Sequence, residues 1–298
     1  MAVIQAGSMG KAADLFSMTQ PAVSKVIAEF EHTLGVRLLD RSRQGVTPTP
    51  HGRALAKRGI AVFDELRQGV QDLDFLSDPT AGELRIGSTE LLAPAVVAPA
   101  IDRLSRQYPR MTFHIVTGDT ASLYPQLAAR NVEFIISRIT GPITEEYSAD
   151  ILFHDPLVVA AGANNPLSRR RKIALAELMN EPWVLGVDSV SSAVQGQVFR
   201  ACGLPMPQMT VSAVSVNLRY ELLATGRFLT MFPDFSLRLP RRHPSLRALP
   251  VELHNTRVPI AIVTLKNRTL SPIVALFVDR VRDLIRPLAR HDAGRPNG

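Results

Sequence analysis

The sequence predicts a multidomain protein of the α/β class, and three observations support this prediction. Residues 1 to 48 alternate short helical patterns with turn residues, residues 49 to 78 carry one uninterrupted helical pattern, and residues 81 to 290 alternate strand and helix patterns. With 298 residues and 46% hydrophobic content, the chain is long enough for two domains that each bury a core of their own.

Two short helices with a tight turn between them are predicted near the N-terminus. Ser8 can cap the first helix, and Thr19 can cap the second, in which Pro21 falls in the first turn and Gly35 follows the last one. Ser and Thr accept hydrogen bonds from unpaired N–H groups at helix starts, Pro suits a first turn, and Gly suits a C-terminal cap. These signals predict a helix-turn-helix.

The second of these helices is predicted to have one buried face and one free face. Its apolar residues follow helical spacing, and we expect them to be buried: Val23, Val26, Ile27, Phe30 and Leu34. The free face carries Gln20, Ser24 and Lys25, near the helix N-terminus with its outward N–H groups. In a helix-turn-helix, such residues reach base edges in the major groove. A plain helical hairpin is the alternative that this spacing also allows.

A short basic hairpin is predicted directly after the second helix. Residues 36 to 39 and 46 to 47 form its strands, and the turn contains Arg41, Ser42, Arg43, Gln44 and Gly45. Arg41 and Arg43 would then lie along a phosphate backbone, which guanidinium groups bind through paired hydrogen bonds. This basic hairpin favours a DNA-reading module over a plain helical hairpin.

The stretch AADLFSMTQPAVSKVIAEFEHTLGVRLLDRSRQGVTPTPHG resembles the winged helix-turn-helix of LysR-type transcriptional regulators. The AA, TQPAVS, FE, LGVRL, R and T-x-x-G elements occur in the order and spacing of that family. We therefore expect Gln20, Ser24 and Lys25 on bases or adjacent phosphates. We expect Thr19 as the cap of the reading helix, and Arg41 and Arg43 on phosphates.

The chain departs from the family pattern at its start. Members usually have a whole helix before the Gly7-Ser8 pair, whereas residues 1 to 6 resemble only the end of such a helix. They lack the basic region and apolar run of a signal peptide. We expect Val3 and Ile4 to pack on Leu15 and Phe16, the first helix to be truncated, and a start codon to lie upstream.

One long helix is predicted over residues 49 to 78, with Thr49 as its cap and Pro50 at its first position. An apolar stripe runs along it, formed by Leu55, Val62, Phe63, Leu66, Val70, Leu73 and Leu76. A second copy of the chain could cover this stripe, and packing within one chain is the alternative. The resemblance implies a linker helix through which two DNA-binding heads pair as a homodimer or homotetramer.

A first α/β lobe is predicted after the hinge at residues 78 to 82. Strands at 83–87, 111–117 and 134–136 alternate with helices at 91–108 and 123–129, which predicts a parallel sheet. Ligands bind outside the carboxyl ends of such strands, at 88–90, 118–120 and 137–138. We assign this lobe to about 81–156 and 266–290.

A second lobe is predicted over about 157–265, after a crossover at 150–161. It contains strands at 157–161, 183–186, 209–211, 228–232 and 258–265, and helices at 173–179, 192–201 and 217–225. An amphipathic helix at 271–286 closes the chain, with Ile273, Leu276, Phe277, Val281, Leu284 and Ile285 inward. Residues 287 to 298, and above all the tail from 291, are expected to be disordered.

Two α/β lobes joined by two crossing strands form the architecture of a type II periplasmic binding protein, which the resemblance also implies for the effector-binding domain. We expect the effector to contact hydroxyl, amide and guanidinium groups on loops between the lobes: Ser88, Thr89, Thr120, Ser137, Arg138, Ser192, Ser215 and Asn217. Arg138 would suit an organic anion. The alternative is that the hydroxyl groups only cap helices.

Other classes of protein find little support in the sequence. The single cysteine, Cys202, excludes an intramolecular disulfide, the seven histidines are scattered, and no nucleophile or phosphate-loop motif occurs, so we expect neither an enzyme nor a metal or other cofactor. A free solute carrier would leave the DNA-reading module without a role. We expect a transcriptional regulator in the bacterial cytoplasm, associated with the nucleoid. Its expected partners are double-stranded promoter DNA, a small-molecule effector and RNA polymerase, and the sequence fits an activator as well as a repressor.

Overall fold

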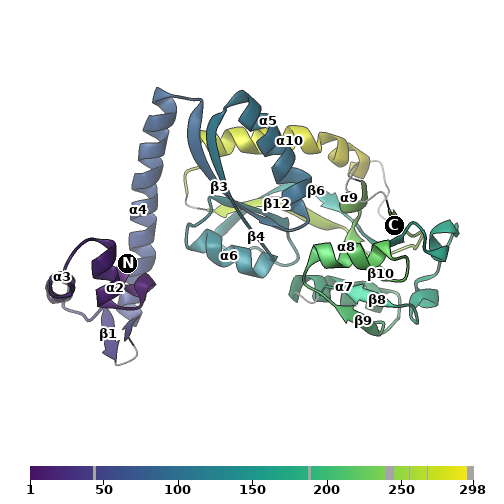
Figure 1. Cartoon of the computed structure of the whole chain (residues 1–298), viewed down its shortest axis with the longest axis horizontal. Coiled ribbons are helices and arrows are strands. Elements are labelled where there is room, and N and C mark those ends of the chain that lie inside the picture. The colour runs from purple at the N-terminus through teal and green to yellow at the C-terminus, as the bar shows by residue number, and fades with distance from the viewer. Residues whose placement is uncertain (43–44, 187–188, 239–244, 255, 267, 294–298) are drawn as a thin grey trace. The chain divides into compact units, whose positions relative to one another are not determined.

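The computed structural model of the chain describes residues 1–42, 45–186, 189–238, 245–254, 256–266 and 268–293. It divides into two compact units, Met1–Val70 and Gln71–Gly298. Figure 1 labels the helices and strands of both units.

The first unit contains three helices, a hairpin and the first part of a long helix. Helices α1 (Ala2–Ala6), α2 (Met9–Leu15) and α3 (Gln20–Leu34) precede the antiparallel strands β1 (Leu39–Ser42) and β2 (Gly45–Pro48). The predicted caps are confirmed: the Ser8 side chain accepts from the Lys11 N–H, and Thr19 accepts from that of Ala22. Gly35 ends α3 in the left-handed conformation, at φ 69°.

The core of this unit is smaller than the sequence predicts. It forms where α1 and α2 meet α3 and the hairpin, around the buried residues Val3, Met9, Ala12, Ala13, Val23, Leu38 and Leu39. Only Val23 and Ile27 of the predicted α3 face reach this core, whereas Phe30 is 46% exposed and Val26 and Leu34 are exposed as well. The prediction for these three residues is wrong, because α3 extends about 22 Å, farther than the five- and seven-residue helices that pack on it.

Leu15 and Phe16 are also exposed, so the predicted packing of Val3 and Ile4 on these two residues is wrong. Val3 and Ile4 pack instead in the cluster around Ala12 and Ala13, whose small side chains let the helices approach closely.

The long helix α4 runs over Pro50–Ser77, as predicted. The Thr49 hydroxyl accepts a hydrogen bond from the Gly52 N–H at 3.0 Å and donates one to the Arg37 carbonyl at 2.7 Å. Leu55 packs against the core of the first unit. The rest of the predicted apolar stripe is exposed in the single chain, at Val62, Phe63, Leu66, Val70, Leu73 and Leu76.

The second unit contains two five-stranded sheets, and the first has the order β4-β3-β5-β12-β6. Strand β3 (Ala81–Thr89) is parallel to β4 (Arg110–Gly118) and β5 (Phe134–Arg138), which confirms the predicted parallel pairing. Strands β6 (Tyr147–Asp155) and β12 (Val258–Leu265) are antiparallel to each other, and β12 is antiparallel to β5.

Two predictions for this lobe are therefore corrected. Residues 258–265 lie in the first sheet, not in the second lobe, and the first half of the predicted crossover, 150–155, belongs to strand β6, which pairs with β12 from end to end. Strand β6 lies at the edge of the first sheet, and its polar and apolar residues alternate only in part. Without clear alternation, the sequence pattern did not indicate a strand here.

Helices cover the first sheet. A π-helical turn at Ala93–Val97 continues into α5 (Ala98–Gln107), α6 is Thr120–Ala128, and α10 is Pro272–Ala293. Inward residues of α10 such as Phe277 and Val281 are buried as predicted. The helix continues to Ala293, so predicted disorder before residue 294 is wrong; residues 294–298 lie outside the described residues.

The second sheet has the order β11-β7-β10-β8-β9 and forms the second lobe. Its strands are β7 (Leu157–Gly162), β8 (Trp183–Leu185), β9 (Met209–Ser212), β10 (Leu229–Pro233) and β11 (Leu246–Ala248). Short 3-10 turns lie at Pro166–Arg169 and Leu175–Leu178, and the helices are α7 (Ser189–Ala201), α8 (Val216–Ala224) and α9 (Asp234–Arg238). The lobe has its own core around Trp183 and Phe199.

The chain passes between the two sheets at Pro156 and again between β11 and β12, where the structure describes residues 249–254 and 256–257. These two crossings confirm the predicted two-lobed arrangement. Within the part of the chain that the structure describes, no helix is long and apolar enough to cross a membrane.

Candidate nucleic-acid interface and ligand cavity

The N-terminal end of α3 presents the side chains that the sequence predicts for DNA contact. Thr19, Gln20, Lys25 and Arg41 are exposed and Ser24 is partly exposed. Lys25 lies 3.9 Å from Glu29 in an exposed ion pair, which water and salt screen and which leaves its charge available to a phosphate. The predicted Arg43 lies outside the described residues.

A hydrogen bond connects α3 with the hairpin. The Arg41 guanidinium donates from Nη1 to the Ser24 hydroxyl at 2.9 Å. Arg41 lies within strand β1, not in the turn as predicted, and its partner in β2 is Val46. Because this bond orients the guanidinium toward α3, the arginine and the helix present one continuous polar surface.

The connection from α3 to the hairpin is fixed by a carboxylate. Glu31 accepts hydrogen bonds through Oε1 from the N–H groups of Leu38 and Leu39, at 2.6 and 3.0 Å. Charge-assisted bonds of this kind are stronger than neutral ones. Glu31 thus holds the basic strand against the helix that carries Gln20 and Ser24.

The second unit contains a cavity of about 330 Å³ that residues of both sheets line. A cavity of this size lies at the lower end of the range for small-molecule sites. Three of the sequence-predicted residues line it: Thr89 at the end of β3, Thr120 at the start of α6 and Arg138 at the end of β5. These are positions outside the carboxyl ends of parallel strands, as expected.

The other predicted residues do not line the cavity. Ser88 and Ser137 are fully buried, because neighbouring side chains of a strand point to opposite faces, and Thr89 and Arg138 take the cavity face. Ser215 accepts a hydrogen bond from the Leu218 N–H and caps α8, and Asn217 is exposed on that helix. Ser192 lies in α7, and its side chain is outside the described residues.

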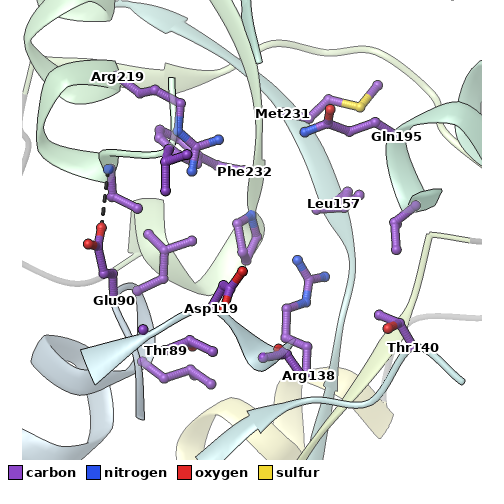
Figure 2. Close-up of a pocket in the computed structure, with 18 of the residues that line it drawn as sticks. Thr89, Glu90, Asp119, Arg138, Thr140, Leu157, Gln195, Arg219, Met231 and Phe232 are labelled. Carbon is purple, nitrogen blue, oxygen red and sulfur yellow. Dashed lines mark hydrogen bonds between the residues drawn. The ribbon is translucent and has the colours of Figure 1, made fainter. Parts of the chain in front are cut away.

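Glu90 and Asp119, which fall in the predicted ranges 88–90 and 118–120, also line the cavity, whereas sequence reasoning missed Thr140, Gln195 and Arg219. Figure 2 shows Glu90, Asp119 and Arg138 on one side of the cavity and Gln195, Arg219 and Met231 on the opposite side. One signal could have found Arg219, since it falls on the same helical face as the buried Val216, Tyr220 and Leu223. A charged side chain at a helix position where the pattern predicts a buried apolar residue indicates a ligand-binding site.

Glu90 bridges the two lobes. Its Oε2 accepts a hydrogen bond from the Val216 N–H at 3.2 Å, and Figure 2 shows this bond as a dashed line. The neighbouring Leu91 packs against the cores of both lobes. The loop after β3 therefore contacts the N-terminus of α8, where a carboxylate is stabilised by the outward N–H groups.

Asp119 is the cap of α6 and stays ionised. Hydrogen bonds from Ser122 lower the pKa of the Asp119 carboxyl, and one of them, from the Ser122 N–H to Oδ1, measures 2.8 Å. On the opposite lobe, the Arg219 guanidinium lies over the Phe232 ring, 4.7 Å from its centre. Arg219 is buried, so its charge acts in a medium that screens it weakly.

Asp155 lies next to Arg138 at the first crossing between the lobes. Burial raises the pKa of the Asp155 carboxyl to about 7, although the Arg138 charge and a hydrogen bond from the Phe235 N–H act in the opposite direction. That bond, from the Phe235 N–H to Oδ1, measures 3.0 Å and joins the end of β6 to the start of α9. Among the described residues there is no group of three His, Cys, Asp or Glu side chains that could hold a metal ion.

Comparison with protein families identifies both units. The family model described as "Bacterial regulatory helix-turn-helix protein, lysR family" matches residues 1–53. The family model described as "LysR substrate binding domain" matches residues 77–286.

Named relatives match over nearly the whole chain. The uncharacterized HTH-type transcriptional regulator YdcI of Escherichia coli (strain K12) is 24% identical over 95% of this chain and 92% of that protein. The HTH-type transcriptional regulator TdcA of the same strain is 25% identical over 94% of this chain and 89% of its own length.

Solved structures show the same fold. A full-length variant of OxyR from Pseudomonas aeruginosa superposes with a TM-score of 0.68 at 20% identity, over 99% of this chain and 95% of that one. Full-length CbnR complexed with its target DNA superposes with a TM-score of 0.56 at 21% identity, over 96% of both chains.

Proposed function

The chain belongs to the LysR family of bacterial transcriptional regulators, and from this premise we propose which residues read DNA and which bind the effector. As a member of the family it is a DNA-binding regulator with an effector-binding domain, and it is not an enzyme. The family does not fix the DNA sequence, the effector or the residues that contact them.

We propose that the start of α3 reads bases and that the hairpin binds phosphates. Gln20, Ser24 and Lys25 contact bases or adjacent phosphates in the major groove, with Thr19 as the cap that keeps this end of the helix open to DNA. Arg41 and Arg43 bind the phosphate backbone. The observation that carries this proposal is the hydrogen bond from Arg41 to Ser24, which fixes the phosphate-binding strand relative to the reading helix.

We propose that two chains pair through α4. The stripe that contains Val62, Leu66 and Leu73 is exposed in the single chain, and Leu66 is 64% exposed. A second copy would bury it, as a homodimer or within a homotetramer. Pairing makes the second DNA contact effectively intramolecular, so an interrupted inverted repeat in promoter DNA is the expected target. The protein then acts on RNA polymerase in the bacterial cytoplasm, at the nucleoid.

We propose that the effector occupies the cavity between the lobes and carries an anionic group that binds Arg138. Thr89 and Thr120 line the same cavity and offer hydroxyl groups to that ligand. Binding shifts the population of lobe arrangements, and α4 passes this change to the DNA-binding heads. A ligand that contacts both lobes can do this because its affinity differs between the open and closed arrangements.

A selection experiment tests this function. The full chain is incubated with a library of random duplexes, and bound duplexes are amplified and sequenced over several rounds. We expect one enriched site that contains an inverted repeat. Recovery of unselected sequence at every round would contradict sequence-specific binding.

The effector assignment is tested by a thermal-shift screen of small organic acids on the full chain. Arg138→Ala should lose the ligand response and keep DNA binding. Arg106→Ala, an exposed arginine of α5 outside the cavity, is the matched control. An unchanged response in Arg138→Ala would place the anion elsewhere.

A further inference from the structure

The charges that line the cavity balance. Its ionisable residues are Glu90, Asp119, Arg138 and Arg219, which give two carboxylates and two guanidinium groups. An anion without a positive group would be attracted by the two arginines and repelled by the two carboxylates. A ligand with one positive and one negative group keeps the balance.

The order of the charges along the first sheet is also fixed. Strand β3 lies between β4 and β5, and all three are parallel, so their carboxyl ends lie side by side. Asp119 follows β4, Glu90 follows β3 and Arg138 ends β5. This edge therefore presents two acidic groups and then a basic one, which matches a small molecule with an ammonium group beside a carboxylate.

Both acidic groups are oriented by hydrogen bonds and keep acceptor capacity for a ligand. Asp119 uses Oδ1 for the Ser122 N–H at 2.8 Å, and Glu90 uses Oε2 for the Val216 N–H at 3.2 Å. A carboxylate has two oxygens that can each accept more than one bond. The hydrogen bonds from Ser122 also lower the pKa of Asp119, so its charge is present at neutral pH.

The opposite lobe supplies an amide and apolar surface. Gln195 is only 3% exposed, and its Oε1 has no hydrogen-bond partner among the residues that the structure describes. A buried acceptor without a partner destabilises the empty cavity, so a donor group on the ligand would satisfy it. The remaining wall is largely apolar and includes Leu91, Leu92, Leu157, Val194, Val214, Met231 and Phe235.

We propose that the ligand is an α-amino acid with an uncharged side chain, bound with its carboxylate on Arg138 and its ammonium group on Asp119 and Glu90. The side chain packs on the apolar wall, and where it carries a donor group that group reaches Gln195. This inference rests on the proposed function, since it specifies the ligand of the same cavity.

Two conservative variants test the ammonium site without removing its hydrogen bonds. Asp119→Asn keeps an oxygen for the Ser122 N–H, and Asn caps helices as well as Asp does. Glu90→Gln keeps an oxygen for the Val216 N–H. Each change removes one charge only. Asp102→Asn, on the exposed face of α5, is the matched control.

The probes are the uncharged L-amino acids and the matching acids that lack the amino group. L-valine is compared with 3-methylbutanoate, L-leucine with 4-methylpentanoate and L-phenylalanine with 3-phenylpropanoate, by thermal shift and calorimetry on the full chain. At least one amino acid should bind at least about tenfold more tightly than its partner acid, because it adds a charge-assisted hydrogen bond. Asp119→Asn and Glu90→Gln should each reduce this ratio by about tenfold, and Asp102→Asn should leave it unchanged.

Two outcomes would overturn the inference: the acids bind as tightly as the amino acids, or none of the amino acids binds. Selection of a DNA site by the same preparation separates these outcomes from failure of the proposed function. If the chain selects DNA and responds to acids without an amino group, the regulator assignment holds and the ligand class is wrong. If it selects no DNA sequence, the DNA-reading assignment fails independently of any ligand.

Discussion

The Glu90 carboxylate in the first lobe accepts a hydrogen bond from the Val216 N–H in the second, at 3.2 Å. This contact places a negative charge from one sheet at the N-terminus of a helix that packs on the other. It lies at the wall of the cavity, so any ligand there is bound beside a contact that holds the lobes together.

Loss of this contact should loosen the start of α8. In Glu90→Ala, amide exchange at Val216 should be about tenfold faster, since a hydrogen bond to a charged group is lost. Hydrogen exchange followed by mass spectrometry over residues 213–220 measures this. The Ser122 amide, bonded to Asp119, should exchange at an unchanged rate. Equal exchange rates of the Val216 amide in the unchanged protein and in Glu90→Ala would show that the Glu90–Val216 contact does not hold the lobes together.

The hairpin arginines should contribute to DNA affinity without selecting sequence. Arg41→Ala should weaken binding to all duplexes alike and reduce the slope of log K against log salt by about one, because one phosphate contact is lost. We expect the same of Arg43→Ala. Binding titrations at several salt concentrations measure the slope, with Arg106→Ala as control. An unchanged slope would remove the arginine from the phosphate contacts.

Ser24→Ala and Lys25→Ala should instead change which sequence is preferred. Base contacts specify the site, and a lost bidentate or paired contact costs about 1 to 3 kcal/mol of discrimination. Repeating the duplex selection with each variant should relax the preference at one or two positions. Because Ser24 also accepts from Arg41, its variant should affect salt dependence slightly as well. Identical selected sites in all proteins would place the reading residues elsewhere.

The α4 stripe should hold two chains together. Leu66→Glu puts a charge on a surface that pairing would bury, so it should shift the protein from dimer to monomer. Sedimentation velocity at several concentrations measures the change. Lys57→Glu is the matched control, because it lies nine residues, or two and a half turns, from Leu66 and so on the opposite side of the helix. Dissociation by both variants, or by neither, would contradict pairing through the stripe.

Stability of the second unit should depend on pH through Asp155. Its pKa is raised to about 7, so the folded protein binds a proton that the unfolded chain releases at lower pH. The contribution of Asp155 to the free energy of unfolding is fully present below the ordinary pKa of an aspartate, and it is lost as pH rises through about 7. The effect is of the order of a few kcal/mol at most. The charged groups that face it are Arg138, Asp234 and Arg238.

Asp155→Asn should remove this dependence. The amide oxygen of the asparagine can still accept a hydrogen bond from the Phe235 N–H. Because an amide does not titrate in this pH range, no charge forms at this position as pH rises. Denaturant unfolding at pH 5 and pH 8 should therefore show a smaller loss of stability in the variant than in the unchanged protein. Asp102→Asn, exposed on α5, serves as control. The same pH dependence in Asp155→Asn and the unchanged protein would exclude Asp155 as its source.

Features that depend on neighbours in the sequence were predicted correctly. Ser8, Thr19 and Thr49 cap their helices, because a cap needs only its own side chain and an N–H three residues on. The two lobes followed from alternating patterns, and the parallel pairing of β3 with β4 and β5 followed from the βαβ alternation. The DNA-reading module was identified because its residues lie in one continuous stretch.

Tertiary structure alone decided the burial of α3 and the composition of the cavity. Helical spacing places Phe30 and Val23 on one face, but burial depends on what packs there, and only Val23 meets another element. Gln195 and Arg219 come from the second lobe, far along the chain from Glu90 and Arg138, and a sequence pattern does not bring such residues together. Strand alternation then determined that Thr89 and Arg138 face the cavity while Ser88 and Ser137 do not, since the register of a sheet is set by its partners.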